Sequence, residues 1–185
     1  MGKVFLNYEQ QLKKLQEDKK LNIPDLDNAY EMLKRYSYYS LISGYKEQFK
    51  NPDTTNYRAD VSFEDIVALY EFDESLRGLF LKYLQKIERQ MKSYISFYFC
   101  EKYGERQEEY LTSSNYNYSN KNKRDIDRLI KILKRYTEGN TDYHYINHAS
   151  AKYGNVPLWV LINALTFGNV SKLYMLSRYD IQAKI

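Results

Sequence analysis

Residues 88–99 read ERQMKSYISFYF and bring together two kinds of side chain that contact polyanions. Arg89 and Lys92 stand a few residues before Tyr94 and Tyr98, on what the spacing predicts to be one long helix. Cationic groups bind phosphate, and aromatic rings stack on bases. The same stretch would also form a packed helix seam, because its apolar and aromatic residues recur at steps of three and four. It is therefore either a polyanion contact or a packing face.

A second group of cations lies on the segment 121–137, where its members also recur at steps of three and four. The group consists of Arg124, Arg128, Lys131 and Arg135. On a helix these residues form one stripe, opposite an apolar face that includes Ile126 and Leu133. Guanidinium groups at this spacing could follow an RNA backbone. The alternative is the solvated side of an amphipathic helix.

The two histidines of the chain, His144 and His148, are four residues apart and would share a helix face, which is a metal-ligand spacing. No carboxylate follows His144 in the HExxH pattern and no cysteine lies nearby, so the sequence predicts no metal site. One histidine could still act in catalysis without a metal. Phosphate-binding and serine-nucleophile motifs of the GxGxxG, GK[ST] and GxSxG types are absent, and no cofactor is expected.

Composition narrows the class of protein. The 185 residues include 28 basic and 24 acidic side chains, and the net charge of +4 is compatible with a nucleic-acid partner. The 21 tyrosines could line a core or stack on bases. No apolar run approaches the ~20 residues that cross a bilayer, and the first residues lack a signal-peptide core. The single cysteine, Cys100, excludes an intrachain disulfide and is expected to be an inert buried thiol. We expect a cytoplasmic protein without membrane contact.

The elements that must position these residues are predicted to be helices, because prolines and glycines are few and β-branched residues dominate no run. The strongest signal covers about residues 62–103, where Ser62 and Asp65 form a capping-box-like pair and Gly104 follows the end. Shorter helices are expected over residues 7–19, 25–44, 121–137, 141–153 and 157–167, with a last helix from Val170, capped by Asn169. No stop signal precedes Ile185, so we expect a single all-α domain over residues 1–185 that lacks part of its C-terminal region.

Four blocks of the sequence resemble the Abi family of bacterial abortive-infection (phage-resistance) proteins, of the AbiD/AbiF-like type. The blocks are YSYYSLISGYKEQFK, SFEDIVALYEFDESLRGLF, KIERQMKSYISFYFCEKYG and VPLWVLINALTFGNVSKLY. They occur in the order of the family and span residues 36–174. The resemblance implies an all-α, HEPN-like helical bundle built around the long central helix. It also implies phage defence, RNA as partner and a homodimer, since HEPN nucleases are metal-independent RNases that juxtapose two Arg-x4-6-His motifs.

This sequence departs from that motif. Alignment on EKYG at 101–104 places Lys92 and Tyr98 at the positions of the family's basic residue and histidine. Arg89 is the other candidate cation, and His148, in a block shared with the family, is the other candidate for proton transfer. A tyrosine with a pKa near ~10 is a poor general base at neutral pH, although its hydroxyl can donate to a phosphate oxygen.

Two functions therefore stay open at this point. In the first, the protein binds RNA through Arg89, Lys92 and the cationic stripe at 124–135, and cleaves it without a metal. In the second, it is a non-catalytic helical module of a defence or toxin–antitoxin-like system that binds RNA or protein as an oligomer. The missing histidine favours the second, and the basic stripe does not distinguish them.

Overall fold

The structure is a computed structural model that describes residues 4–138 and 141–185. Within these residues every regular element is a helix, and extended backbone pairs only in three isolated bridges. The predicted all-α fold class is confirmed. In the same residues no helix is both long enough and apolar enough to span a membrane.

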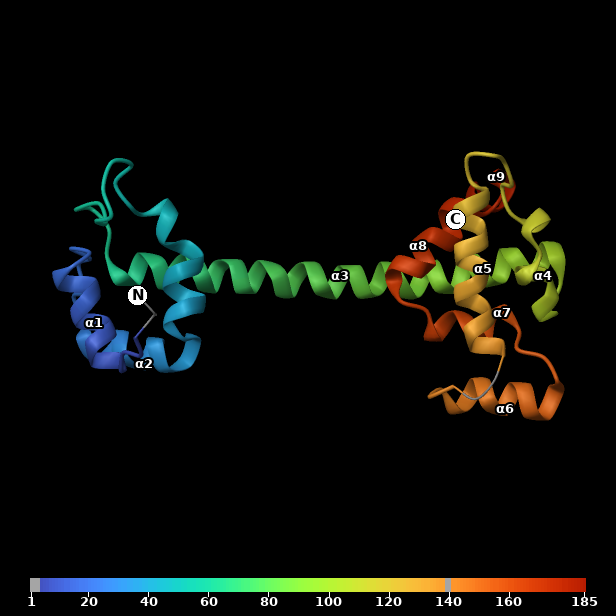
Figure 1. Ribbon diagram of the computed structural model, residues 1–185, viewed down its shortest axis with the longest axis horizontal. Coiled ribbons are helices and arrows are strands. Elements are labelled where there is room, and N and C mark those ends of the chain that lie inside the picture. The colour runs from blue at the N-terminus through green and yellow to red at the C-terminus, as the bar shows by residue number, and fades with distance from the viewer. Residues whose placement is uncertain (1–3, 139–140) are drawn as a thin grey trace. The chain divides into compact units, whose positions relative to one another are not determined.

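Figure 1 shows the order of the helices along the chain. They are α1 (Tyr8–Glu17), α2 (Leu26–Tyr36), α3 (Phe63–Tyr103), α4 (Gln107–Leu111), α5 (Lys123–Thr137), α6 (His144–Tyr153), α7 (Leu158–Leu161), α8 (Phe167–Leu176) and α9 (Tyr179–Gln182). A π-helical turn covers Tyr39–Ser43, and 3-10 turns cover Lys46–Gln48, Ser113–Asn115 and Ile162–Ala164.

Helix α3 confirms the strongest prediction from the sequence, because its 41 residues begin and end where the capping signals stand. The backbone N–H of Ser62 donates to the Asp65 carboxylate at 2.8 Å, and the N–H of Asp65 donates to the Ser62 hydroxyl at 3.3 Å. At the other end Gly104 adopts a φ of 99°, which favours glycine, and its N–H donates to the carbonyl of Cys100.

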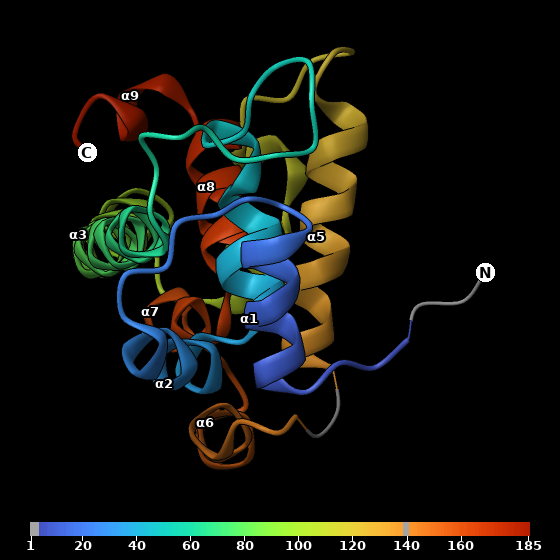
Figure 2. The same cartoon turned by 90° about the vertical axis from the view of Figure 1, so that its left-hand side faces the viewer.

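The chain forms two compact units, one up to Leu81 and one from Lys82 onward, each with its own buried core. In the first unit, α1 lies against α2, as Figures 1 and 2 show. Its core includes Leu15, Leu33 and Ile66, and none of the three is exposed to solvent. The single domain over residues 1–185, expected from the sequence, stays a prediction.

The second unit packs α5 and α8 together with the C-terminal half of α3 (Figure 1). Ile95 and Phe99 of α3 are fully buried there with Leu129 of α5 and Leu173 of α8. The amphipathic helix expected at 121–137 is confirmed as α5, whose buried residues are Ile126, Leu129 and Leu133.

Two expected helices are interrupted. The helix expected over 25–44 ends at Tyr36, because Ser37 adopts φ 62° and ψ 147°, outside the helical region. The expected helix after Pro157 ends as α7 at Leu161, and a 3-10 turn and an extended Leu165 follow.

The predicted cap of the last helix was wrong. Thr166, and not Asn169, is the N-cap of α8, because its hydroxyl accepts from the N–H of Asn169. Threonine and asparagine both form N-caps, so the residue type alone does not separate the two positions. Val170 and Leu173 of α8 are fully buried. The predicted helix to Ile185 also breaks at Ser177, whose hydroxyl donates to the carbonyl of Leu173 at 2.6 Å.

Candidate functional site

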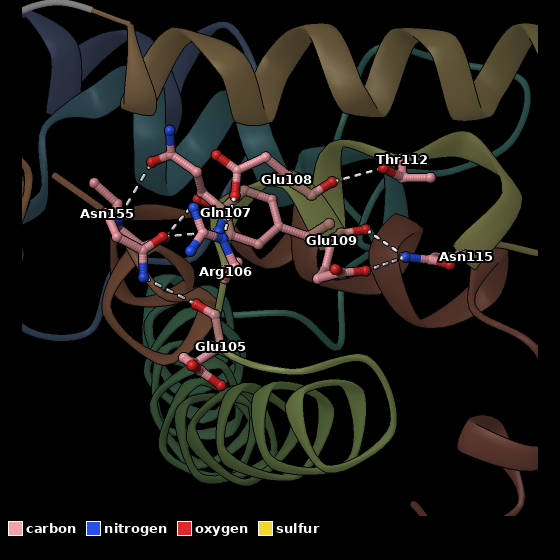
Figure 3. A network of polar contacts seen from close by, with 10 residues as sticks. Glu105, Arg106, Gln107, Glu108, Glu109, Thr112, Asn115 and Asn155 are labelled. Carbon is pink, nitrogen blue, oxygen red and sulfur yellow. Dashed lines mark hydrogen bonds and ion pairs between the residues drawn. The ribbon is translucent and has the colours of Figure 1, made fainter.

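A polar network fixes α4 to the loop that precedes α7 (Figure 3). The Asn155 side chain accepts from the N–H of Gln107 at 2.8 Å and donates to the carbonyl of Glu105 at 3.1 Å. The N–H of Val156 in turn donates to the side chain of Gln107. Buried Tyr110 donates its hydroxyl to the Val156 carbonyl at 2.6 Å. These bonds hold the chain in place immediately before Pro157 and α7.

Helix α7 and the turn after it form one side of a groove against α3. The groove has a volume of about 350 Å³ and is lined by Arg89, Lys92, Ser93, Ser96, Trp159, Ile162 and Asn163. Two sequence-predicted residues, Arg89 and Lys92, are therefore brought together with Trp159, a residue that is 48% exposed. Cations beside an exposed aromatic ring suit a nucleotide, because one group binds phosphate and the other stacks on a base.

The ammonium group of Lys92 is already engaged within the chain. Its Nζ lies 2.8 Å from the Glu88 carboxylate, one helical turn away, and 3.5 Å from the Asn163 carbonyl. The Lys92 side chain is only 15% exposed, so these contacts hold it against the groove. Among the side chains that the structure describes, no carboxylate pairs with Arg89, which is exposed. Arg89 is therefore the more accessible cation.

A second groove continues from the first and shares Ser93, Ser96 and Trp159 with it. It has a volume of about 530 Å³ and adds Phe97 and Cys100 to the lining, with Phe97 61% exposed. Burial raises the pKa of the Cys100 thiol to about 11. The thiol is therefore protonated at neutral pH. Cys100 is only half-buried and lines this groove, so the buried thiol expected from the sequence is not found, and its inertness stays a prediction.

The pair Lys92 and Tyr98 does not converge within the chain. Tyr98 is half-buried against the core of the second unit, and the Lys184 ammonium lies 5.1 Å from the centre of its ring. Six residues on a helix correspond to a rotation that places Tyr98 away from the Lys92 groove. Tyr98 is not among the residues that line that groove.

His148 lies on α6, outside both grooves. Its ring lies edge-on to the ring of Tyr153, with 6.3 Å between the two ring centres. Both His148 and His144 are exposed. In residues 4–138 and 141–185, no three side chains of the histidine, cysteine, aspartate or glutamate types gather as a metal site would require.

The cationic stripe of Arg124, Arg128, Lys131 and Arg135 is exposed along α5. Arg128 lies 3.5 Å from Asp125, but both side chains are more than 60% exposed, so this pair is weak. The opposite face of α5 is buried, which is what both readings of the stripe require. The stripe and the groove are two separate candidate contacts.

Sequence reasoning missed Trp159 as a functional candidate. It stands in an apolar run after Pro157, where its neighbours Leu158 and Leu161 are buried, whereas Trp159 itself lines both grooves. A signal was available: Trp159 is the one tryptophan of the chain and lies in a block shared with a known family.

The fold and the groove define an all-α protein with a basic and aromatic surface groove. A scan against family models matches residues 31–185 to the family described as Abi-like protein, and the chain belongs to this family of abortive-infection-type proteins. Searches of the curated proteins and of the solved structures found no match.

Proposed function

We propose that this Abi-like protein acts in phage defence by binding RNA in the groove between α3 and α7. The observation that carries the proposal is the position of Arg89 beside the half-exposed Trp159, since no carboxylate of residues 4–138 and 141–185 pairs with the Arg89 guanidinium. The relation to the AbiD/AbiF-like and HEPN proteins, inferred from sequence blocks, belongs to the same proposal. The grooves favour single-stranded RNA, because stacking needs unpaired bases.

Different side chains of the groove would contact different parts of a nucleotide. The Arg89 guanidinium binds phosphate through two parallel hydrogen bonds, and Trp159 supplies a face for a base. Lys92 adds positive charge, although a phosphate must compete for it with Glu88. The α5 stripe would add a salt-sensitive contact to a longer RNA.

Binding without cleavage is the function that the single chain supports better. The groove lining includes no histidine, and Tyr98 lies away from Lys92. A HEPN-like reaction at Arg89 and Lys92 would need the base that receives the 2′-hydroxyl proton to come from outside the groove, because neither Tyr98 nor His148 lines it. RNA cleavage is therefore the alternative function, and the following experiment distinguishes it from binding alone.

The test measures fluorescence anisotropy of labelled single-stranded RNA with the full chain, and follows RNA integrity on gels with and without EDTA. We expect Trp159→Ala to raise Kd by roughly 5- to 150-fold, because stacking is worth about 1–3 kcal/mol per base. Arg89→Ala should raise Kd by roughly 10- to 150-fold, because hydrogen bonds to a charged group are worth about 1.5–3 kcal/mol. Trp159→Phe should keep most of the affinity. Lys172→Ala, an exposed cation on α8 outside both grooves, is the matched control and should change nothing.

Three outcomes would contradict the proposal or part of it. Absence of RNA binding refutes it. Binding that ignores Arg89→Ala and Trp159→Ala but falls with Arg128→Ala and Arg135→Ala moves the contact to the α5 stripe. Cleavage that survives EDTA and is lost in Lys92→Ala and Tyr98→Phe establishes the nuclease instead.

A further inference from the structure

A third cavity of the second unit lies apart from the two grooves beside α3. It opens between the segment after α4 and the loop that joins α8 to α9, and its volume is about 890 Å³. Its lining includes Ser113, Ser114, Tyr118, Arg178, Tyr179 and Asp180, none of which lines either groove. Sites for small molecules have volumes of roughly 300–1,000 Å³. The cavity is therefore large enough for a small ligand and separate from the RNA groove.

Hydrogen bonds hold both walls of this cavity in place. In the first wall, the Asn115 amide group donates to the main-chain carbonyl of Glu109 at 2.9 Å and to its carboxylate at 3.0 Å (Figure 3). In the second wall, the Gln182 amide group donates to the carbonyls of Tyr174 and Ser177 at 2.9 and 3.0 Å. These bonds fix the first wall to α4 and the second wall to the end of α8.

The two walls meet at a floor of buried residues. The N–H of Asn117 donates to the Leu176 carbonyl at 2.8 Å, and Tyr116 forms an isolated antiparallel bridge with Ser177. Tyr116 is 1% exposed, and Ser177 is not exposed at all. The cavity is thus already formed in the free chain, and a preformed site binds its ligand at a lower cost in conformational entropy.

Arg178 gives the cavity a cation that is available to a ligand. Asp180, two residues further on, pairs with Lys102 instead, and no carboxylate of residues 4–138 and 141–185 forms an ion pair with Arg178. The hydroxyl groups of Ser113 and Ser114 form no hydrogen bond within the part of the chain that the structure describes. A guanidinium group binds phosphate through two parallel hydrogen bonds, and hydroxyl groups can donate to its remaining oxygens. This part of the cavity therefore suits a phosphate group.

Two tyrosines line the cavity from opposite walls. Tyr118 is 46% exposed and Tyr179 is 74% exposed, and aromatic side chains of this kind stack on any nucleobase. Next to them, the Lys102 ammonium lowers the pKa of Asp180 below its usual range. The Asp180 carboxylate is therefore ionised at neutral pH and only accepts hydrogen bonds, which suits the hydroxyl groups of a ribose.

We infer that this cavity binds a free nucleotide, with its phosphate at Arg178 and its base against Tyr118 and Tyr179. A sugar phosphate would use Arg178 and the serine hydroxyl groups but would leave both tyrosine rings uncovered. Inorganic phosphate would fill only a small part of the volume. The site would give this chain a second ligand besides the RNA proposed above, and the inference does not rest on RNA binding.

Isothermal titration calorimetry of the full chain with AMP tests the site, and adenosine reports on the part that holds the base. We expect Arg178→Ala to raise the Kd of AMP by roughly 10- to 150-fold and to leave that of adenosine unchanged, because only AMP carries the phosphate. Tyr118→Ala should raise the Kd of both ligands by roughly 5- to 150-fold, because the base loses a stacking partner. Tyr118→Phe keeps the ring and should keep most of the affinity.

Two exposed residues outside the cavity supply matched controls. Lys172→Ala removes a cation of α8, and Tyr153→Ala removes a tyrosine of α6 that is 65% exposed. Neither variant should change the Kd of AMP. Arg178 and Tyr118 are exposed as well, so circular dichroism should show the same helicity in all variants.

The inference fails if AMP does not bind at millimolar concentration. It also fails if AMP binding survives Arg178→Ala and Tyr118→Ala but is lost in Arg89→Ala and Trp159→Ala, because AMP then occupies the RNA groove. Ribose 5-phosphate that binds as tightly as AMP would show that the tyrosine rings contact no base. Absence of RNA binding together with intact AMP binding would refute the RNA proposal alone and leave this site in place.

Discussion

Arg89 and Lys92 are three residues apart on one helix, yet they differ in what they can bind. The Lys92 ammonium already has Glu88 at 2.8 Å and the Asn163 carbonyl at 3.5 Å. Arg89 is exposed, and no carboxylate of the described residues pairs with it. If RNA binds in this groove as we propose, its phosphate gains more from Arg89, because it displaces no existing ion pair there. Lys92 instead links α3 to the turn after α7, through its contact with the Asn163 carbonyl.

The Tyr110 hydroxyl forms a hydrogen bond to the loop before α7. It is 1% exposed and donates to the Val156 carbonyl at 2.6 Å. We expect Tyr110→Phe to lower the free energy of unfolding by about 1–3 kcal/mol, because a buried carbonyl is left without its donor. Urea denaturation measures the change. Tyr118→Phe, at a tyrosine that is 46% exposed, should stay within about 0.5 kcal/mol of wild type. Equal effects in the two variants would argue against this role of the hydroxyl.

At the scale of elements, the hydrogen bonds of its first turn stabilise the start of α3. The N–H and the hydroxyl of Ser62 both donate to the Asp65 carboxylate, and these bonds lower the pKa of Asp65 below its usual range. Because the pKa is lower in the folded chain, the ionised carboxylate stabilises the fold above the unfolded pKa near ~4. That stability is lost as the pH falls through the folded pKa.

The variant Asp65→Asn tests this contribution. We expect the difference in unfolding free energy between wild type and variant to be full at pH 7 and to shrink as the pH falls below about 4. Urea titrations at pH 7, 5 and 3 measure it. A difference that is the same at pH 3 as at pH 7 would show that the effect does not come from ionised Asp65. Asp60→Asn, at an exposed acid just outside the helix, is the control.

At the scale of the whole molecule, the two core clusters are separate sets of residues. Leu33 is fully buried in the cluster of the first unit, and Leu129 is buried in that of the second. Each cluster therefore contributes its own share of hydrophobic stabilisation.

Native-state hydrogen exchange shows how far the two units unfold together. Leu33→Ala should cost about 2–5 kcal/mol and speed exchange in α1 and α2, with little change in α5 and α8. Leu129→Ala should do the reverse. If either variant speeds exchange equally in both units, the chain unfolds as one cooperative domain, which is the expectation from the sequence.

The sequence alone determined the helical class, the bounds of α3, the amphipathic face of α5 and the relation to the Abi family. The first three of these features depend on residues a few positions apart: the Ser62–Asp65 cap, Gly104, and the repeat of Ile126, Leu129 and Leu133. Local backbone and side-chain preferences decide such patterns, so neighbouring residues are enough to predict them.

The tertiary structure decided which distant residues meet. Lys92 and Tyr98, paired by sequence alignment, lie on different sides of α3, while Lys92 shares a groove with Trp159. That meeting depends on the bonds of Asn155 and Tyr110 that hold the α7 segment against the second unit, and no local pattern near residue 92 contains them. The N-cap of α8 also lies three residues before the predicted Asn169, at Thr166.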